Sequence, residues 1–306
     1  METHKIGWVN WLTLIVLGAI WGSSFILMKI GSRSLDSFEL AAFRLFFAGI
    51  FLMPLYIQFI RKVKLNLYLW IVAASLIGSG IPSILYASSS SKIDSNINGV
   101  INSLTPIFTL LVGVFWFKKK TSNLSLVGLF IGFFGVIMLL FQKTTNIGNT
   151  NYALFPIFAS VLYGINVNLV KEKISHLSSM EILAGVFGTL VMISFPYLLY
   201  RNSFYGFEIS LLEFQFWKPN LNPIIQRTNS VFAIFILGSI GSAFASFLFY
   251  FLLKRTNTLF SATNTYLIPL MSIFWGYLDG ELIGWMHFVS LFIILVGVYL
   301  VSKRKD

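Results

Sequence analysis

Long apolar runs, each bounded by charged or turn-forming residues, alternate with short polar segments along the chain. A helix needs about 20 apolar residues to cross roughly 30 Å of hydrocarbon. Helices are expected because lipid offers the backbone no hydrogen-bond partners, and the alternation of a barrel strand is absent. The pattern predicts an all-α integral membrane protein with ten transmembrane helices, near residues 8–30, 38–60, 67–88, 95–117, 124–142, 152–171, 179–200, 231–253, 258–278 and 284–302.

The segment 201–230 is the one long polar connection between these runs. It contains Lys218-Pro219 and Asn222-Pro223 together with charged and aromatic residues. Such proline-containing pairs are typical of turns. We interpret this segment as a surface loop, with a helix lying on the membrane surface as the alternative.

Composition agrees with a membrane protein. Only 11% of the 306 residues are charged, whereas soluble domains contain about 25%. The net charge of +11 is then explained by basic cytoplasmic loops, and a nucleic-acid partner is not expected. The chain has no cysteine and three scattered histidines, so we expect no disulfide, metal site or cofactor. Nothing in the sequence specifies an oligomeric state.

Charge distribution predicts the orientation. In the ten-helix topology, fourteen Lys and Arg residues fall on one side of the membrane and seven on the other. Cytoplasmic loops carry the excess of Lys and Arg. We therefore expect both termini in the cytoplasm and the protein in the inner membrane. The run Lys118-Lys119-Lys120 is part of this orientation signal.

The chain also repeats itself. A shift of 142 residues aligns 18–54 with 160–196, with eight identities in 37 positions. A shift of 163 aligns the third and fourth runs with the eighth and ninth, and a shift of 162 aligns the fifth with the tenth. Each unit holds five helices, so the second must enter the membrane from the opposite side. We predict two inverted five-helix repeats, 1–145 and 146–306, the second with the extra loop near 201–230. Such repeats are typical of carriers that bind substrate near the midplane.

Several motifs resemble a known family. Ile20-Trp21-Gly22-Ser23-Ser24-Phe25, Phe43-Arg44-Leu45-Phe46-Phe47-Ala48 and the stretch from Asn98 to Gly113 are similar to helices 1, 2 and 4 of the EamA family of the drug/metabolite transporter superfamily. The resemblance covers nearly the whole chain. It implies ten helices in two inverted repeats and a central cavity lined mainly by helices 1, 3, 4, 6, 8 and 9. Members are similar to exporters of amino acids, metabolites or drugs.

One position departs from that family. Its fourth helix often ends in a Gly-Glu pair, which Gly280-Glu281 matches in the second repeat, while the first repeat has Lys118 there. We interpret Glu281 as a contact at a helix start or loop, with a gating element as the alternative.

Residues that match between the repeats near mid-helix are the candidates for substrate binding. Trp21 matches Tyr163, and Asn102 matches Thr265; Asn166 and Asn264 lie nearby. Polar groups there are unfavourable in lipid and should face a cavity. Together they predict a neutral, partly aromatic cavity. Packing of Trp21 and Tyr163 between helices is the alternative.

Other polar residues leave more than one interpretation open. Serines and tyrosines share one face of the third and of the eighth helix, where helix packing and cavity lining both fit. Arg44, about two turns into helix 2, should face protein or water, as an anchor or as a substrate contact. Lys29 and Lys171, at helix ends, are expected to snorkel outward.

These features favour a secondary transporter that exports a small metabolite, such as an amino acid, by alternating access. An intramembrane enzyme or a channel-like protein is the alternative, but no cluster of catalytic residues and no ring of charges supports either. We therefore expect no enzymatic activity. No Asp or Glu lies in the middle of a span, so the sequence offers no proton carrier. The expected partners are a small-molecule substrate and membrane lipid.

Overall fold

A computed structural model describes residues 8–118, 122–140, 150–212, 217–256, 261 and 263–302. Helices dominate these residues, and no strand occurs among them. Seven helical segments are long and apolar enough to cross a membrane: Trp8–Gly31, Ser37–Ile60, Leu65–Ser90, Ser95–Phe115, Asn151–Ile174, Ser179–Tyr200 and Pro223–Arg255. The chain also contains three shorter apolar helical stretches: Leu126–Gly135, Ile268–Leu278 and Trp285–Gly297. The prediction of an all-helical membrane protein is confirmed, and the count of ten spans stays a prediction.

Most of these segments contain a local change of helix type. Their elements, in chain order, are α1 (Trp8–Gly31), α2 (Ser37–Gly49), η1 (Ile50–Leu52), α3 (Met53–Ile60), α4 (Leu65–Ser75), η2 (Leu76–Gly80), α5 (Ile81–Ser90), α6 (Ser95–Asn102), α7 (Thr105–Phe115), α8 (Asn123–Leu140), η3 (Thr150–Ala153), α9 (Leu154–Leu169), η4 (Val170–Ile174), α10 (Ser179–Tyr200), η5 (Ile209–Leu211), α11 (Pro223–Ile236), η6 (Leu237–Phe244), α12 (Ala245–Arg255), η7 (Thr263–Tyr266), α14 (Ile268–Leu278) and α15 (Trp285–Ser302).

The helix expected at 231–253 begins eight residues earlier, at Pro223. Asn222 is its N-cap, and the Asn222 side chain accepts hydrogen bonds from the backbone N–H groups of Ile224 and Ile225. Proline suits the first helical position because its missing N–H would lack a helical partner anyway. An Asn-Pro pair therefore starts a helix here, although we interpreted it as part of the 201–230 loop.

Proline lies in the first turn of two helices, α7 and α14. The helix of α6 ends at Asn102, and α7 resumes at Thr105 with Pro106 in its first turn. The tight turn of η7 likewise gives way to α14, which has Pro269 in its first turn. Proline cannot donate a backbone hydrogen bond and clashes with the preceding turn. The break after Asn102 leaves this polar residue near the middle of the segment Ser95–Phe115.

The outer faces of the helices are apolar. Phe51, Phe130 and Trp285 are each more than 70% exposed, and many other large apolar side chains are also exposed. Soluble monomers rarely expose apolar surface on this scale. These side chains are therefore suited to contact lipid.

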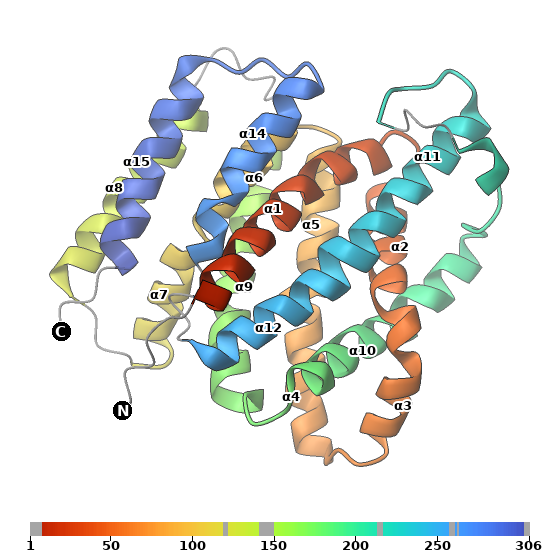
Figure 1. The fold of residues 1–306 in the computed structure, drawn as a ribbon, viewed down its shortest axis with the longest axis horizontal. Helices are drawn as coiled ribbons and strands as arrows, with labels where there is room; N and C mark the ends of the chain where they lie inside the picture. The colour runs from red at the N-terminus through yellow and green to blue at the C-terminus, as the bar shows by residue number, and fades with distance from the viewer. Residues whose placement is uncertain are drawn as a thin grey trace.

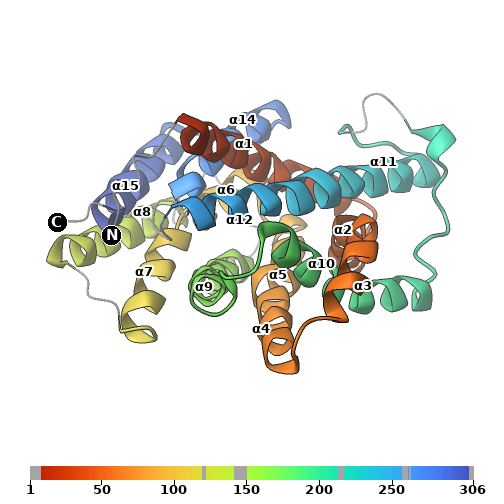
Figure 2. The ribbon, with the colours of Figure 1, turned by 60° about the horizontal axis from the view of Figure 1, so that its bottom comes forward.

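Figures 1 and 2 show how the helices pack. The α1 helix lies against α14, α11 and α12, while α10 lies against α2, α3 and α4. The pair α8 and α15 stands side by side at one edge of the molecule in both views. The remaining helices enclose the centre, where α9 contacts both α5 and α7.

Candidate functional site

A cavity of about 110 Å³ lies among these central helices. That volume is several times the roughly 10–15 Å³ that one water needs on this measure. Residues of α1, α2, η2, α5, α6, α7, α9, η6, α12 and η7 line it. The structure brings all six predicted site residues to this one cavity: Trp21, Asn102, Tyr163, Asn166, Asn264 and Thr265. Their role in substrate binding stays a prediction.

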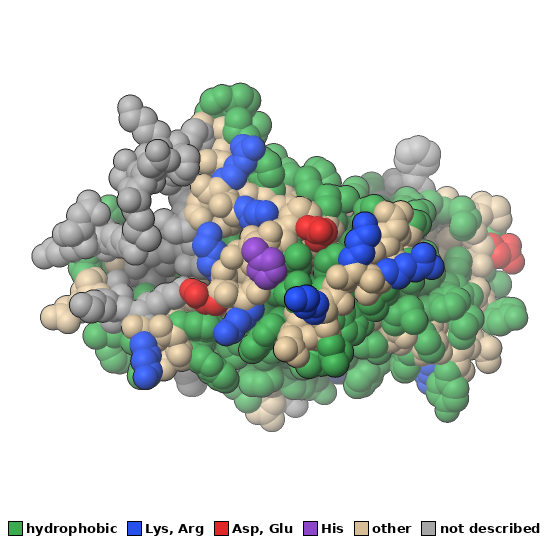
Figure 3. Space-filling view, turned by 90° about the horizontal axis from the view of Figure 1, so that it is seen from below, with side chains coloured by type: hydrophobic (Ala, Val, Ile, Leu, Met, Phe, Trp, Pro, Cys, Tyr) green, Lys and Arg blue, Asp and Glu red, His purple; other side chains and the backbone are tan. Residues whose placement is uncertain are grey.

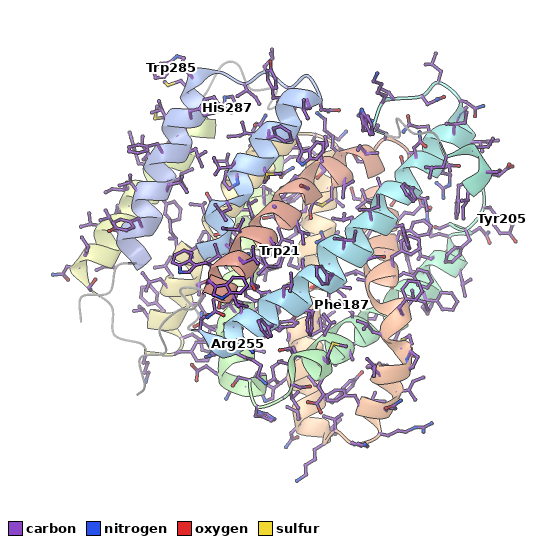
Figure 4. All side chains as sticks on the ribbon, in the orientation of Figure 1. Trp21, Phe187, Tyr205, Arg255, Trp285 and His287 are labelled. Carbon is purple, nitrogen blue, oxygen red and sulfur yellow. The ribbon has the colours of Figure 1, made fainter. Side chains whose placement is uncertain are left out.

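Trp21 lies in the middle of α1, where Figure 4 labels it. Its indole Nε1 donates a hydrogen bond of 3.0 Å to the carbonyl oxygen of Gly241 in η6. Its ring lies 5.5 Å from the ring of Phe249 on α12. Trp21 therefore packs between helices and also lines the cavity, so the two interpretations weighed from the sequence both hold.

The opposite wall is built around Tyr86 and Tyr163. Their rings stack with centroids 6.1 Å apart, and Phe25 meets the Tyr86 ring edge-on at 5.4 Å. The Tyr86 hydroxyl donates a hydrogen bond of 2.6 Å to Oδ1 of Asn102, the last residue of α6. The helix break after Asn102 thus places an amide beside an aromatic wall.

Two further amides have unused hydrogen-bonding atoms. Asn166 and Asn264 are 6% and 0% exposed. Oδ1 of Asn166 and both side-chain polar atoms of Asn264 have no hydrogen-bond partner among the described residues. Buried polar atoms are costly unless they are paired. Because both residues line the cavity, a bound solute can supply the missing partners.

The expectation of a neutral cavity is wrong, because Arg44 lines it. Its Nε donates a hydrogen bond of 2.8 Å to Oγ of Ser242, and Nη1 lies 3.7 Å from Sδ of Met28. The sequence placed Arg44 inside helix 2 but did not assign the direction of its side chain.

Sequence reasoning also missed several lining residues. Ser79, Ser242 and Ser246 belong to the serine faces of the third and eighth spans, for which helix packing and cavity lining both fitted the sequence. Their regular spacing was the available signal. Phe25, Met28 and Phe249 gave no signal, because an apolar residue in a membrane helix looks the same whether it faces lipid or a cavity.

One end of the molecule is closed by charged residues, and we call it the ion-pair end. Lys29 Nζ lies 2.7 Å from Oδ2 of Asp279 and 2.7 Å from Oε1 of Glu281, so Lys29 is paired where we expected snorkelling. Arg33 adds a contact of 3.2 Å to Asp279. Two more pairs join Arg201 to Asp36 and Arg227 to Glu39, each at 2.6 Å. All five contacts connect the first half of the chain (1–145) to the second (146–306).

Glu281 is also bound to the start of α6. Its carboxylate accepts hydrogen bonds from N and Oγ of Ser95, both at 2.8 Å, and from N and Nδ2 of Asn96 at 3.2 and 2.7 Å. Burial alone would raise the pKa of Glu281, but the Lys29 ammonium and these hydrogen bonds outweigh it and hold the pKa below its usual value of 4.5. The helix-start interpretation of Glu281 agrees with this contact.

The opposite end, formed by residues 61–64, 171–177 and 254–256, we call the basic end. Figure 3 shows Lys and Arg side chains gathered over it. A wedge of about 460 Å³ opens there between α3 and α10, lined by Leu55, Lys64 and Met180 among others. Lys171 donates to the carbonyl oxygens of Leu253 and Thr256, at 2.9 and 3.2 Å. Six of the fourteen basic residues predicted for this side lie outside the described residues: Lys5, Lys119, Lys120, Lys303, Arg304 and Lys305.

Within the described part of the chain, no group of three His, Asp or Glu side chains is placed to hold a metal ion. The cavity offers hydrogen bonds, aromatic surface and one cation. This chemistry suits reversible binding of a small organic solute.

Known proteins are similar to this chain over nearly its whole length. The sequence profile of the EamA-like transporter family matches residues 9–141 and again residues 150–303. An uncharacterized transporter of Archaeoglobus fulgidus is 26% identical over 96% of this chain and 97% of its own length. The uncharacterized inner membrane transporter YedA of Escherichia coli is 25% identical over 95% of this chain and 90% of its own. A solved crystal structure is similar over 94% of both chains, with a TM-score of 0.59 and 16% identity, a likeness that shows the fold alone. The double match of the profile confirms the resemblance found in the sequence, and the chain belongs to the EamA-like transporter family.

Proposed function

We propose that this chain is a secondary transporter with ten transmembrane helices in two inverted repeats, 1–145 and 146–306. It exports a small metabolite, such as an amino acid, across the inner membrane by opening the central cavity to alternate sides. In this proposal α8, α14 with η7, and α15 complete the ten spans. The observation that carries it is the cavity itself, because matching residues of the two repeats meet there.

Seven matched pairs line the cavity. Under the shift of 142 residues these are Trp21/Tyr163, Ser24/Asn166 and Phe25/Val167; under the shift of 163 they are Gly78/Gly241, Ser79/Ser242, Tyr86/Phe249 and Asn102/Thr265. They account for fourteen of the twenty lining residues. A two-fold axis through the cavity produces this pairing, as expected of carriers built from inverted repeats.

Contacts between helices in one half also have counterparts in the other half. A Cβ added to Gly22 would lie 2.5 Å from Cβ of Met271, and one added to Gly164 would lie 3.0 Å from Cβ of Phe108. Gly22 matches Gly164, and Met271 matches Phe108, so one contact maps onto the other. The approach of α1 to α14 is thereby repeated as the approach of α9 to α7.

The outer pair α8 and α15 follows the same rule. Gly135 lies against Ile294, and Gly297 lies against Gly132. Under the shift of 162 residues Gly135 matches Gly297 and Ile294 matches Gly132. This second pair of corresponding contacts does not involve the cavity. It supports a symmetry that relates the whole of both halves.

The difference between the two ends supports alternating access. Five ion contacts bridge the halves at the ion-pair end, while a hollow lined by residues of α3, α4 and α10 lies at the basic end. We place the basic end in the cytoplasm because it carries the Lys and Arg excess. The structure then corresponds to a state closed toward the outside. Opening it requires the bridging contacts to separate as the halves rock.

Counterflow in proteoliposomes tests this function. Vesicles preloaded with one solute of an amino acid and metabolite panel should transiently accumulate the labelled solute against its gradient, with saturable kinetics. A Tyr163→Ala variant, altered in the cavity, should lose this exchange, and Tyr277→Ala, altered on the 72% exposed surface, should keep it. Non-saturable flux without counterflow would indicate a channel, and the absence of any flux would overturn the proposal.

A further inference from the structure

Arg44 is a cation inside the cavity without a counter-charge. It lies seven residues after the start of α2, about 10 Å along the helix axis. No Asp or Glu is among the twenty residues that line the cavity. Within the described chain, the guanidinium donates to one hydroxyl, Ser242 Oγ, and approaches one thioether, Met28 Sδ, which is a weak acceptor. Neither of these two contacts is with an anion, so the guanidinium can still form a charge-assisted pair with a ligand.

Packing does not explain this cation. The position that matches Arg44 in the second repeat is Val186, which is fully buried in α10. The equivalent helix therefore packs without a charge at this site. A guanidinium excluded from bulk water is costly unless an anion accompanies it. These facts together indicate that the partner of Arg44 is a ligand.

The surroundings define that ligand further. Thr105, the first residue of α7, lines the same cavity and adds a hydroxyl group to its wall. Oδ1 of Asn166 and the amide of Asn264 lack partners. Aromatic rings of Trp21, Tyr86 and Tyr163 provide a flat apolar surface. A ligand with one anionic group, one or two neutral polar groups and an apolar body would match the guanidinium, the amides and the rings.

We infer that Arg44 is the anion subsite of the cavity and that the substrate is an organic monocarboxylate with an aromatic or apolar body. This inference rests on the proposed transport function. The planar fork of arginine matches a carboxylate with two parallel hydrogen bonds. A second carboxylate would be buried without a partner, so dicarboxylates are excluded. Amino acids belong to this class, with Asn166 Oδ1 as an acceptor for their ammonium group.

Ligand binding to the purified full-length chain tests the inference independently of transport. The probes are benzoate, phenylacetate and 3-phenylpropionate, each paired with its neutral carboxamide, and affinity is read from ligand-induced thermal stabilisation. The parent should bind each acid more tightly than its amide. Arg44→Gln should weaken binding of the acids by about 10- to 100-fold and leave the amides within about threefold. Arg44→Lys, which keeps the charge but not the fork, should fall between.

Arg61→Gln is the matched control, because it removes an exposed arginine that lies outside the cavity and outside the contacts that bridge the halves. It should bind the acids like the parent. If Arg44→Gln fails to insert, Ser242→Ala should still lower affinity for the acids, because the guanidinium loses the 2.8 Å hydrogen bond that holds its orientation toward the cavity.

The outcomes separate this inference from the proposed function. Equal binding of acids and amides, unchanged acid binding in Arg44→Gln, or no binding of any acid would overturn the subsite, even where counterflow of neutral solutes is observed. Arg44-dependent binding of acids without counterflow of any solute would support the subsite and overturn the transport function.

Discussion

At the scale of single residues, the same side chains line the cavity and hold neighbouring helices together. The Trp21 indole donates a hydrogen bond to the carbonyl oxygen of Gly241 in another span, and the Tyr86 hydroxyl donates one to the side-chain amide oxygen of Asn102. Each such bond also fixes the direction in which a ring or amide faces the cavity. Substituting these residues should therefore change solute binding more than membrane insertion.

Trp21→Ala, Asn102→Ala and Tyr163→Ala test this expectation. Each removes a ring or amide from the cavity wall, and we expect transport per inserted molecule to fall at least about tenfold, the loss that follows from one good contact of about 1.4 kcal/mol. Membrane abundance should stay near that of the parent, as should both quantities for Trp285→Ala, whose side chain is 71% exposed. Parental transport in all three cavity variants would show that this site assignment is wrong.

The residue scale also shows the limits of sequence reasoning. Asn102, Asn166 and Asn264 could be placed in a cavity because an amide is unfavourable in lipid. For Arg44 the cost of a cation in lipid predicts only that it faces protein or water, and its match Val186 in the other repeat adds no information on its role. Apolar lining residues could not be found at all, since a lipid-facing and a cavity-facing Phe look alike in sequence.

At the scale of helices, the sequence predicted where most helices lie. It missed one helix start and the local changes of helix type. The span expected at 179–200 is observed at Ser179–Tyr200, because Ser178 and Glu181 form a capping box that fixes its start. The start at Pro223 was missed because Asn-Pro signals both a turn and a helix N-terminus. The π-helical turns η2 and η6, at matching positions in the two repeats, could not be foreseen. They contribute Gly78, Ser79, Gly241 and Ser242 to the cavity.

The close approach of α1 to α14 gives a prediction on helix packing. A Cβ at Gly22 would meet Cβ of Met271 at 2.5 Å and the carbonyl oxygen of Ile268 at 2.7 Å, and a backbone oxygen cannot easily move. We expect Gly22→Ala to lower the free energy of unfolding in detergent by about 1–3 kcal/mol. Gly80→Ala is the control, because its nearest neighbour is the flexible end of Leu190 at 3.2 Å. Equal stability of both variants would contradict the packing argument.

The buried Glu281 carboxylate gives a prediction on pH. Its pKa lies below the usual value of 4.5, so its stabilising effect is fully present above pH 4.5 and is lost as the pH falls below that value. Glu281→Gln should lower the free energy of unfolding by up to about 3–5 kcal/mol near neutral pH. The difference from the parent should be constant between pH 8 and pH 6 and should shrink in more acidic solution.

Asp36→Asn serves as the control for this comparison. It keeps the N-cap of α2 and removes only a half-exposed ion pair with Arg201, for which we expect about 0–1 kcal/mol. A difference between parent and Glu281→Gln that grows with acidity would refute the assignment of Glu281 as a buried, paired anion.

At the scale of the whole molecule, the two ends are chemically different although the halves correspond. Lys29 and Lys171 match, yet Lys29 pairs with two carboxylates while Lys171 binds backbone carbonyl oxygens. Similarly, Glu39 binds Arg227 across the halves, while its match Glu181 caps its own helix. In the proposed alternating-access mechanism, this asymmetry would stabilise one of the two states.

Orientation in the membrane is a prediction at the scale of the whole molecule. We expect both termini in the cytoplasm and the connection between α10 and α11 outside, because Lys and Arg gather at the basic end. Reporter fusions after Asp306 and near Asn220 measure this directly. A C-terminus found outside the cytoplasm would refute the orientation and the count of ten spans together.

The most direct test of alternating access uses the absence of cysteine in the natural chain. A single cysteine replaces Thr265 in the cavity, and an impermeant maleimide is applied to right-side-out and inside-out vesicles. Introducing Lys29→Gln, which breaks the contacts to Asp279 and Glu281, should raise labelling from the outside and lower it from the cytoplasmic side. A rise from both sides, or no change from either, would contradict a cavity that opens to one side at a time.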